Sequence, residues 1–106
     1  MHAMVLEKKG QPLVYKKMPV PLPANNQLLV KIMACGICRT DLHIIDGDLD
    51  KPKLPLILGH EIVGKVAAIG KDVTGFYTND IVGIPWVGHT CGKCKFCKTG
   101  KENLCD

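Results

Sequence analysis

The sequence predicts a mainly β domain with one or two short helices and a cysteine-rich lobe appended at its end. Short apolar runs separated by glycine and proline are typical of strands and turns. One stretch has the polar start and apolar continuation of a short helix, and the last segment, residues 88–106, has no hydrophobic periodicity. With 106 residues, 46% of them hydrophobic and 23% charged, the chain has the size and composition of one folded domain.

The first part of the chain contains three predicted strands. Residues 4–6 and 13–15 are short apolar runs joined by a Lys-Gly-Gln-Pro turn. Residues 18–26 include three prolines and two asparagines, a composition that predicts a loop. Residues 27–34, with the sequence QLLVKIMA, form the third strand.

A short helix and further strands are predicted beyond residue 35. Residues 36–46 favour a helix, because polar positions 39–41 precede three apolar side chains. A loop over residues 46–55 leads into the most apolar stretch, residues 56–69. This stretch contains Gly59 and Gly64, and glycine within a strand marks a bulge or a close backbone approach. Residues 80–87 give one more strand, and no internal repeat or linker divides the chain.

The cysteine-rich lobe predicts a metal site. Its four cysteines have the spacing C-x2-C-x2-C-x7-C, and they are Cys91, Cys94, Cys97 and Cys105. Four closely spaced thiolates form a closed tetrahedral site of the structural zinc type, and Gly92 and Gly100 would let the backbone turn back towards the metal. An iron–sulfur cluster is the main alternative, but its cysteine runs place the fourth cysteine after three residues and before a proline. A nucleic-acid-binding zinc ribbon is a second alternative, supported only by nearby lysines.

The charge and the aromatic content argue against a nucleic-acid partner. The net charge is +4, from 14 basic and 10 acidic residues, and aromatic residues make up only 5% of the chain. The lysines that share the lobe with the cysteines would offset the negative charge of zinc-bound thiolates; they are Lys93, Lys95, Lys98 and Lys101. A platform of aromatic side chains for stacking bases is therefore not expected.

The start of the chain and the use of cysteine predict a compartment. The sequence has no apolar run long enough for a signal peptide or a membrane span, so we expect no membrane partner. Six cysteines in a short chain could form disulfides, but the spacing of those in the lobe suits metal chelation better. We therefore expect a reducing cytoplasm with metal-bound or free thiols.

A second group of residues with metal-binding and proton-transfer chemistry lies around the predicted helix. Its members are Cys38, Thr40, Asp41, His43, His60 and Glu61. Taken singly, Cys38 could be a small buried residue, His43 a helix-surface residue and His60 a core histidine. Together they supply a soft ligand, an imidazole, two carboxylates and a hydroxyl, which suits an open catalytic zinc site.

Three motifs in order carry a resemblance to a known family. They are the run Cys-Gly-Ile-Cys-Arg-Thr-Asp-Leu-His at residues 35–43, the pattern G-H-E-x2-G-x5-G-x2-V at residues 59–73, and the four-cysteine lobe. The chain resembles the zinc-dependent alcohol dehydrogenases of the medium-chain dehydrogenase/reductase family over nearly its whole length. Residues 84–86 and 102–105 are most similar to bacterial members that act on small primary alcohols. The resemblance implies a GroES-like, partly open β-barrel over residues 1–106, with a structural zinc lobe at residues 88–106.

The resemblance also implies roles for single residues. Cys38 and His60 would bind the catalytic zinc, and Asp41 would orient His60. Glu61 would approach the metal during ligand exchange, while Thr40 and His43 would form the inner and outer parts of a proton relay. The remaining implied contacts are the cofactor for Arg39 and His43, the alcohol pocket for Leu49 and Trp86, and structural zinc for Cys91, Cys94, Cys97 and Cys105. Cys35 has no ligand role in the family and is interpreted as a packing residue.

Several family features are missing from these residues. The third protein ligand of the catalytic zinc, the Rossmann domain and the segment that completes the catalytic domain would lie beyond Asp106, and no G-x-G-x-x-G motif occurs. Asn79 replaces a glycine usual in the family, and asparagine tolerates the left-handed conformation. We therefore expect a truncated catalytic domain that binds one structural zinc tightly and the catalytic zinc weakly.

Three hypotheses about the protein remain open from the sequence. The first is the amino-terminal part of an alcohol dehydrogenase that oxidises primary alcohols to aldehydes with NAD or NADP, inactive as an isolated chain. The second is a stand-alone zinc-binding module without redox activity, and the third is a nucleic-acid-binding zinc-lobe protein. We also expect a homo-oligomer, with self-association through apolar surface that the missing segments would otherwise cover.

Overall fold

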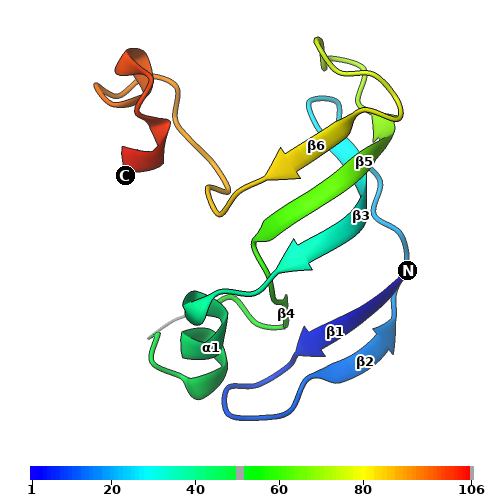
Figure 1. Cartoon of the computed structure of the whole chain (residues 1–106), viewed down its shortest axis with the longest axis vertical. Coiled ribbons are helices and arrows are strands. Elements are labelled where there is room, and N and C mark those ends of the chain that lie inside the picture. Colours follow the sequence, from blue (N-terminus) through cyan, green and yellow to red (C-terminus); the bar gives the residue numbers. More distant parts are fainter. Residues whose placement is uncertain (50–51, 106) are drawn as a thin grey trace.

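The computed structural model describes residues 1–49 and 52–105, which form two antiparallel sheets, one helix and a separate lobe (Figure 1). The first sheet has the order β2-β1-β4, from β1 (His2–Leu6), β2 (Val14–Lys17) and β4 (Leu56–Ile57). The second sheet has the order β3-β5-β6, from β3 (Leu28–Gly36), β5 (Glu61–Ile69) and β6 (Ile81–Ile84). Helix α1 (Arg39–Asp46) joins β3 to β4, and the lobe holds the short 3-10 helices η1 (Cys97–Thr99) and η2 (Glu102–Leu104). The predicted mainly β, partly open architecture is confirmed.

The β1–β2 hairpin forms as predicted, but its second strand is displaced towards the carboxyl end. Met4 pairs with Tyr15 and His2 with Lys17. The turn between the strands has a backbone bond from Gln11 to the Lys8 carbonyl, and Gly10 has a φ of 68°. The backbone N–H of Met18 donates to the Met1 carbonyl at 2.8 Å, which extends the pairing beyond the predicted residues.

The apolar stretch 56–69 is divided between the two sheets. β4 pairs with β1, whereas β5 pairs with β3 and β6. Gly59 lies between them with a φ of 97°, a left-handed conformation that turns the chain from one sheet to the other. Within β5, a Cβ on Gly64 would lie 2.8 Å from the Lys31 carbonyl oxygen, so the predicted close backbone approach is confirmed.

The last strand is shorter than predicted, and the loops differ little from expectation. β6 ends at Ile84 because Pro85 has no N–H to donate to the ladder. Asn79 has a φ of 79°, in agreement with its expected left-handed conformation. Residues 18–26 contain no helix or strand, as predicted; the predicted loop 46–55 begins with the last residue of α1, and its residues 50–51 lie outside the described part.

The two sheets enclose very little core. The buried apolar side chains of the described residues are Val5, Leu6 and Val66, while Ile32, Met33 and Ile81 are more than half exposed. The accessible surface is 8124 Å², against about 5,800 Å² for a compact protein of this mass. The radius of gyration is 15.6 Å, against about 13 Å for a compact domain of this length. The molecule is therefore open rather than closely packed.

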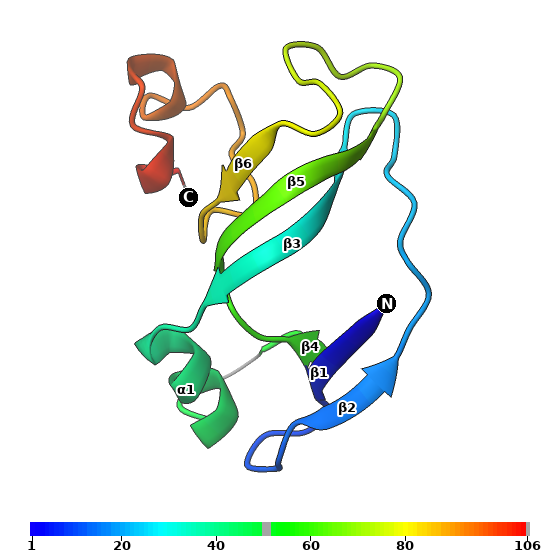
Figure 2. The same ribbon diagram turned by 45° about the vertical axis from the view of Figure 1, so that its right-hand side comes forward.

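The helix and the lobe lie at different places relative to the sheets. Helix α1 follows the end of β3, whereas the lobe follows β6 and lies well away from the β2-β1-β4 sheet in both views (Figures 1 and 2). None of the helices in the described ranges is long and apolar enough to cross a bilayer.

Candidate metal centres

The first candidate centre is built at the beginning of α1. Cys38 is the N-cap residue of the helix, with extended backbone angles, and its sulfur accepts the Thr40 N–H at 3.3 Å. The Asp41 side chain reaches back, and its Oδ2 accepts the Cys38 N–H at 2.9 Å. This reciprocal capping arrangement satisfies two helix-terminal donors and fixes the position of the Cys38 sulfur.

Asp41 also connects the helix to the turn between β4 and β5. Its side chain is 2% exposed, and its Oδ1 accepts the Gly59 N–H at 2.9 Å and lies 3.3 Å from Nδ1 of His60. Although burial opposes ionisation, the N–H groups of Cys38 and Gly59 hold the pKa of Asp41 below its ordinary value. Asp41 thus remains ionised between the two segments that carry the candidate ligands.

His60 faces Cys38 with its other ring nitrogen. The distance from His60 Nε2 to Cys38 Sγ is 2.9 Å. Because Nδ1 faces the acceptor Asp41, that nitrogen carries the hydrogen, and Nε2 is left to bind a metal. Burial opposes protonation of His60, but Asp41 and the Cys38 thiolate raise its pKa. The Thr40 side chain and backbone, together with His60, lower the pKa of Cys38.

The Cys38–His60 pair fits a zinc ion in donor type and direction. Cysteine sulfur and histidine nitrogen are common zinc ligands, and tetrahedral zinc would hold them about 3.5 Å apart. The observed 2.9 Å is shorter than this spacing, so a modest separation of the two side chains would admit the metal. Asp41 lies behind the imidazole ring, and its oxygens are already bonded, so it supports His60 rather than acting as a third ligand.

An open pocket of about 460 Å³ lies in front of this pair. Its lining residues are Cys38, Thr40, His60, Glu61 and Trp86. Glu61 begins β5, and its Oε2 lies 2.7 Å from where a Cβ on Gly36 would be, so the glycine makes room for the carboxylate. The pocket therefore brings five of the residues predicted from the resemblance to one place.

Besides Asp41, three predicted site residues do not line that pocket. Arg39 is exposed at the first position of α1. Leu49 is 42% exposed just beyond the helix, and its carbonyl oxygen accepts the Lys9 side chain. His43 lies on the last turns of α1, where its Nδ1 contacts Oδ2 of Asp48 at 2.7 Å. Asp48 was not identified from the sequence, because one exposed aspartate after a helix has no distinguishing pattern.

Cys35 is not a member of the candidate centre. Its side chain is exposed, and its sulfur lies against the backbone of Gly59, where a Cβ would collide with it. The residue thus restricts what can occupy position 59, which agrees with its interpretation as a packing residue.

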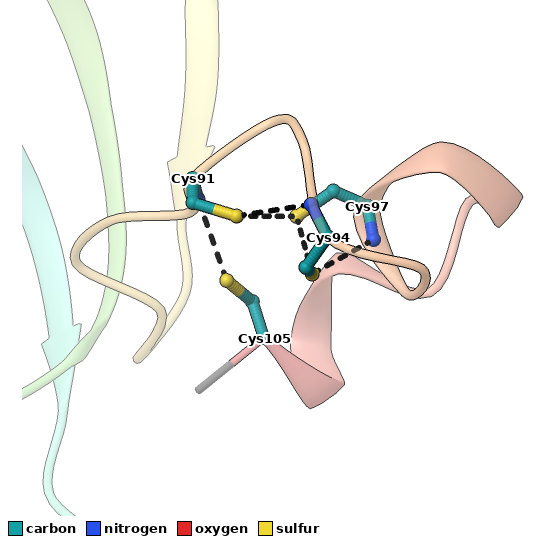
Figure 3. Close-up of side chains that lie close together, drawn as sticks. All are labelled: Cys91, Cys94, Cys97 and Cys105. Atoms are coloured by element: carbon teal, nitrogen blue, oxygen red, sulfur yellow. Dashed lines mark hydrogen bonds between the residues drawn. The ribbon is translucent and has the colours of Figure 1, made fainter.

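The second candidate centre is the four-cysteine lobe, in which the side chains point towards one another (Figure 3). All four sulfur atoms lie within 4.8 Å of one another, and the distances from Cys97 to Cys91 and Cys94 are 4.0 and 3.6 Å. Tetrahedral zinc with four thiolates spaces its sulfur atoms about 3.8 Å apart. None of the four cysteines forms a disulfide, and their spacing leaves room for one ion rather than a cluster of several iron atoms.

Backbone hydrogen bonds and two glycines shape the lobe. The N–H groups of Lys93 and Cys94 donate to Cys91 Sγ at 3.5 and 3.3 Å, and Cys97 donates to Cys94 Sγ at 3.5 Å. Gly92 and Gly100 have φ values of 68° and 70°, so the expected reversals of the chain at these glycines are confirmed.

The thiols of the lobe differ in acidity without a metal. The backbone N–H groups of Lys93 and Cys94 lower the pKa of Cys91 to about 6. Burial and the Cys94 side chain raise the pKa of Cys97 to about 12. One thiolate is therefore stabilised by the backbone, and full deprotonation of the set needs a cation at its centre.

Comparison with known proteins gives a consistent result over the whole chain. Residues 24–106 match the family described as Alcohol dehydrogenase GroES-like domain. An alcohol dehydrogenase from Geobacillus stearothermophilus is 47% identical over 107 residues, which cover 100% of this chain and 32% of the relative.

Solved structures show the same similarity. Zinc dependent alcohol dehydrogenase 2 from Streptococcus pneumonia, in its apo form, has a TM-score of 0.85 at 37% identity. The matched region is 100% of this chain and 30% of that protein chain. CAD from Helicobacter pylori, complexed with NADP(H), has a TM-score of 0.87 at 28% identity, and the matched region is 98% of this chain and 30% of that protein chain. The predicted GroES-like fold is confirmed, and the chain spans about a third of the length of these proteins.

Proposed function

This chain belongs to the alcohol dehydrogenase GroES-like domain family, and we propose that it is the amino-terminal part of the catalytic domain of a zinc-dependent alcohol dehydrogenase. The complete enzyme would oxidise small primary alcohols to aldehydes by hydride transfer to NAD or NADP. The observation that carries the proposal is the Cys38–His60 pair, supported by buried Asp41 and facing a pocket that also contains Thr40.

Each residue of the pocket has a task in this chemistry. Cys38 and His60 would hold a zinc ion, which when bound lowers the pKa of an alcohol that it polarises. Asp41 keeps the hydrogen of His60 on Nδ1 and directs Nε2 into the pocket. The Thr40 hydroxyl would accept the alcohol proton and pass it outward to His43, which releases it to solvent. Glu61 is a carboxylate at the same pocket that could approach the metal while ligands exchange.

Three further residues would contact the substrate or the cofactor. Trp86 lines the pocket, and Leu49 would meet the alcohol from the loop after α1. Exposed Arg39 is available for a cofactor pyrophosphate, but the residues described here form no dinucleotide-binding fold. We propose that the rest of a longer protein supplies the nicotinamide site and the third zinc ligand, and that the enzyme is a homo-oligomer in the cytoplasm, where thiols remain reduced.

The two centres should differ in zinc affinity. The lobe offers four thiolates, whereas the second group is Cys38, Asp41 and His60, of which Asp41 already accepts two backbone N–H groups. We expect one tightly bound zinc per purified chain, measured by mass spectrometry under native conditions and by elemental analysis. Cys94→Ser should lose this zinc, whereas Cys35→Ser, which changes a cysteine outside both centres, should retain it. Two tightly bound equivalents, or zinc loss in Cys35→Ser, would contradict the assignment.

A second candidate function, a zinc-binding module without redox activity, is favoured by the contrast between the four-ligand lobe and the two-ligand pocket. A chimera separates the two candidates. Residues 1–106 would replace the 47% identical segment of the Geobacillus stearothermophilus alcohol dehydrogenase, and alcohol-dependent reduction of NAD or NADP would be measured.

If this chain is part of a dehydrogenase, the chimera oxidises primary alcohols. Thr40→Ala in the chimera should lower kcat at least about 100-fold because a proton-transfer group is lost. Thr78→Ala, which removes an exposed hydroxyl in the β5–β6 loop, is the matched control and should have wild-type kcat. A folded, zinc-loaded chimera that binds cofactor but shows no turnover would favour the module. The isolated chain should show no turnover in either case.

A further inference from the structure

The end of α1 places an aspartate beside a histidine. Gly47 has a φ of 89° and closes the helix, and the backbone N–H groups of Gly47 and Asp48 both donate to the His43 carbonyl oxygen, at 3.1 and 2.9 Å. These two hydrogen bonds to one carbonyl oxygen turn the chain back over the last helical turn. As a result, Oδ2 of Asp48 reaches Nδ1 of the His43 ring at 2.7 Å.

The chemistry of the pair decides which ring nitrogen carries hydrogen. An ionised carboxylate accepts hydrogen bonds and donates none. Nδ1 of His43 must therefore carry a hydrogen to make this contact, and on a neutral ring Nε2 is then without one. Nε2 is the nitrogen that is free to accept a proton.

The loop that carries Asp48 is held from its other side by the β1–β2 turn. The Gly10 N–H donates to the Ile45 carbonyl at 2.7 Å, and the Lys9 ammonium donates to the Leu49 carbonyl. The Lys9 side chain also packs against Gly47, 3.5 Å from where a Cβ would be. Residues on both sides of Asp48 are thus fixed to a strand hairpin, which limits the positions open to the carboxylate.

The exposure of the pair argues against a large contribution to stability. The side chains of His43 and Asp48 are 38% and 58% exposed. Exposed ion pairs contribute little to folding free energy, whereas a carboxylate that fixes one tautomer of a histidine changes what that histidine can do.

We propose that Asp48 is a positioning residue for His43, which holds the ring in the Nδ1-protonated form so that Nε2 receives the proton leaving the pocket. This inference rests on the proposed relay through Thr40. The proton is transferred from the Thr40 side to Nε2, and the resulting imidazolium carries a hydrogen on each nitrogen beside the Asp48 carboxylate. Loss of the Nε2 proton to solvent restores the neutral Nδ1-protonated ring.

The test is a measurement of the His43 tautomer in the zinc-loaded 106-residue chain. Long-range proton–nitrogen NMR of nitrogen-15-labelled histidine distinguishes the two neutral forms, because the protonated and unprotonated ring nitrogens resonate in different regions. The chain has four histidines, and the spectrum of His43→Gln assigns the signals of His43. At a pH where the ring is neutral, Nε2 should give the unprotonated signal and Nδ1 the protonated one.

Variants of Asp48 give the decisive comparison. In Asp48→Ala the two nitrogen signals should exchange order, because neutral imidazole in water favours hydrogen on Nε2. Asp48→Asn keeps an acceptor oxygen and should retain the wild-type order. Asp46→Ala removes an exposed carboxylate from the same helix end and should change nothing.

Two results overturn the proposal: an Nε2-protonated His43 in the unaltered chain, or an unchanged tautomer in Asp48→Ala. If Asp48→Ala does not fold, the order of the signals in the unaltered chain and in Asp48→Asn still decides the question. The measurement needs no turnover, so an inactive chimera would count against the proposed function and leave the tautomer result standing.

Discussion

At the scale of single residues, the Asp41 side chain links three other residues of the site. Its two oxygens accept the N–H groups of Cys38 and Gly59, which lie on segments separated by a helix and a loop, and one oxygen also supports His60. An acceptor that satisfies two backbone donors in a buried place cannot be removed without leaving those donors unpaired.

Asp41→Ala is therefore expected to lower the free energy of unfolding by about 3 kcal/mol, because two N–H groups lose their acceptor. Urea denaturation followed by tryptophan fluorescence, with Trp86 as the probe, measures the change. Asp46→Ala, on the exposed surface of the same helix, should stay within about 0.5 kcal/mol of the unaltered chain. Equal losses in the two variants would show that Asp41 is not a structural anchor.

Gly59 is a second residue whose identity the structure explains. It has a φ of 97°, and a Cβ added to it would collide with the Cys35 sulfur. Gly75 has a similar φ of 80°, but nothing lies within 4 Å of where its Cβ would be. Comparing substitutions at the two glycines therefore distinguishes the cost of backbone strain from the cost of a steric collision.

Gly75→Ala should cost about 1 kcal/mol from backbone strain alone, and Gly59→Ala should cost at least about 1 kcal/mol more. The same denaturation measurement applies. Adding Cys35→Ala to Gly59→Ala should recover part of the extra loss, because the colliding sulfur is gone. If the double variant is no more stable than Gly59→Ala, the crowding explanation is wrong.

The sequence allowed some of these residues to be anticipated and not others. Asp41 could be associated with His60 through the resemblance, but its bond to the Gly59 N–H depends on how two sheets approach each other. Asp48 gave no signal at all, since its contact with His43 arises from the left-handed closure at Gly47. Contacts made by chain reversal are invisible to a search for spaced motifs.

At the scale of elements, the lobe and the sheets are ordered by different forces. The strands are held by backbone ladders, whereas the described residues of the lobe form two short 3-10 helices around a set of converging thiols. The convergence of its cysteines could be anticipated from their spacing, whereas its two 3-10 helices could not, because the segment has no hydrophobic periodicity. The division of residues 56–69 between two sheets could not, because apolar character alone does not show which partner a strand will find.

The acidity difference within the lobe predicts an order of chemical modification. After zinc is removed with a chelator at pH 7, iodoacetamide should label Cys91 before Cys97, because their pKa values are about 6 and about 12 and only the thiolate reacts. Labelling of Cys91 should rise between about pH 5 and pH 7 and then level off. Peptide mass spectrometry measures the rates.

The chain in concentrated urea is the control for this order. Unfolding removes the backbone N–H groups from the Cys91 sulfur, so both cysteines should then react at similar rates. Faster labelling of Cys97 in the folded, metal-free chain would contradict the assigned acidities.

At the scale of the whole molecule, exposed apolar surface is the main feature. The surface area exceeds that of a compact protein of this mass by about 2,300 Å², which is comparable to the area buried in an obligate interface. Strand β6 forms one edge of its sheet, and Ile81 on it is 59% exposed. Among the described residues, the chain therefore presents both apolar surface and an edge strand to which a further strand could pair.

We expect the purified chain to self-associate with increasing concentration, as measured by sedimentation velocity. Ile81→Lys should weaken the association about tenfold by placing a charge on the edge strand. Tyr77→Lys changes a side chain that is 74% exposed in the β5–β6 loop, outside the sheet, and should have little effect. A chain that stays monomeric at high concentration would show that this apolar surface does not drive self-association.

The double attachment of Asp41 has a consequence for evolution and engineering. One carboxylate joins the segments that carry the two candidate zinc ligands and also supports one of them. The same carboxylate therefore supports both the folded structure and the proposed metal centre. A substitution at position 41 should impair both at once. Variants selected only for thermal stability should keep this aspartate even when no selection for catalysis is applied.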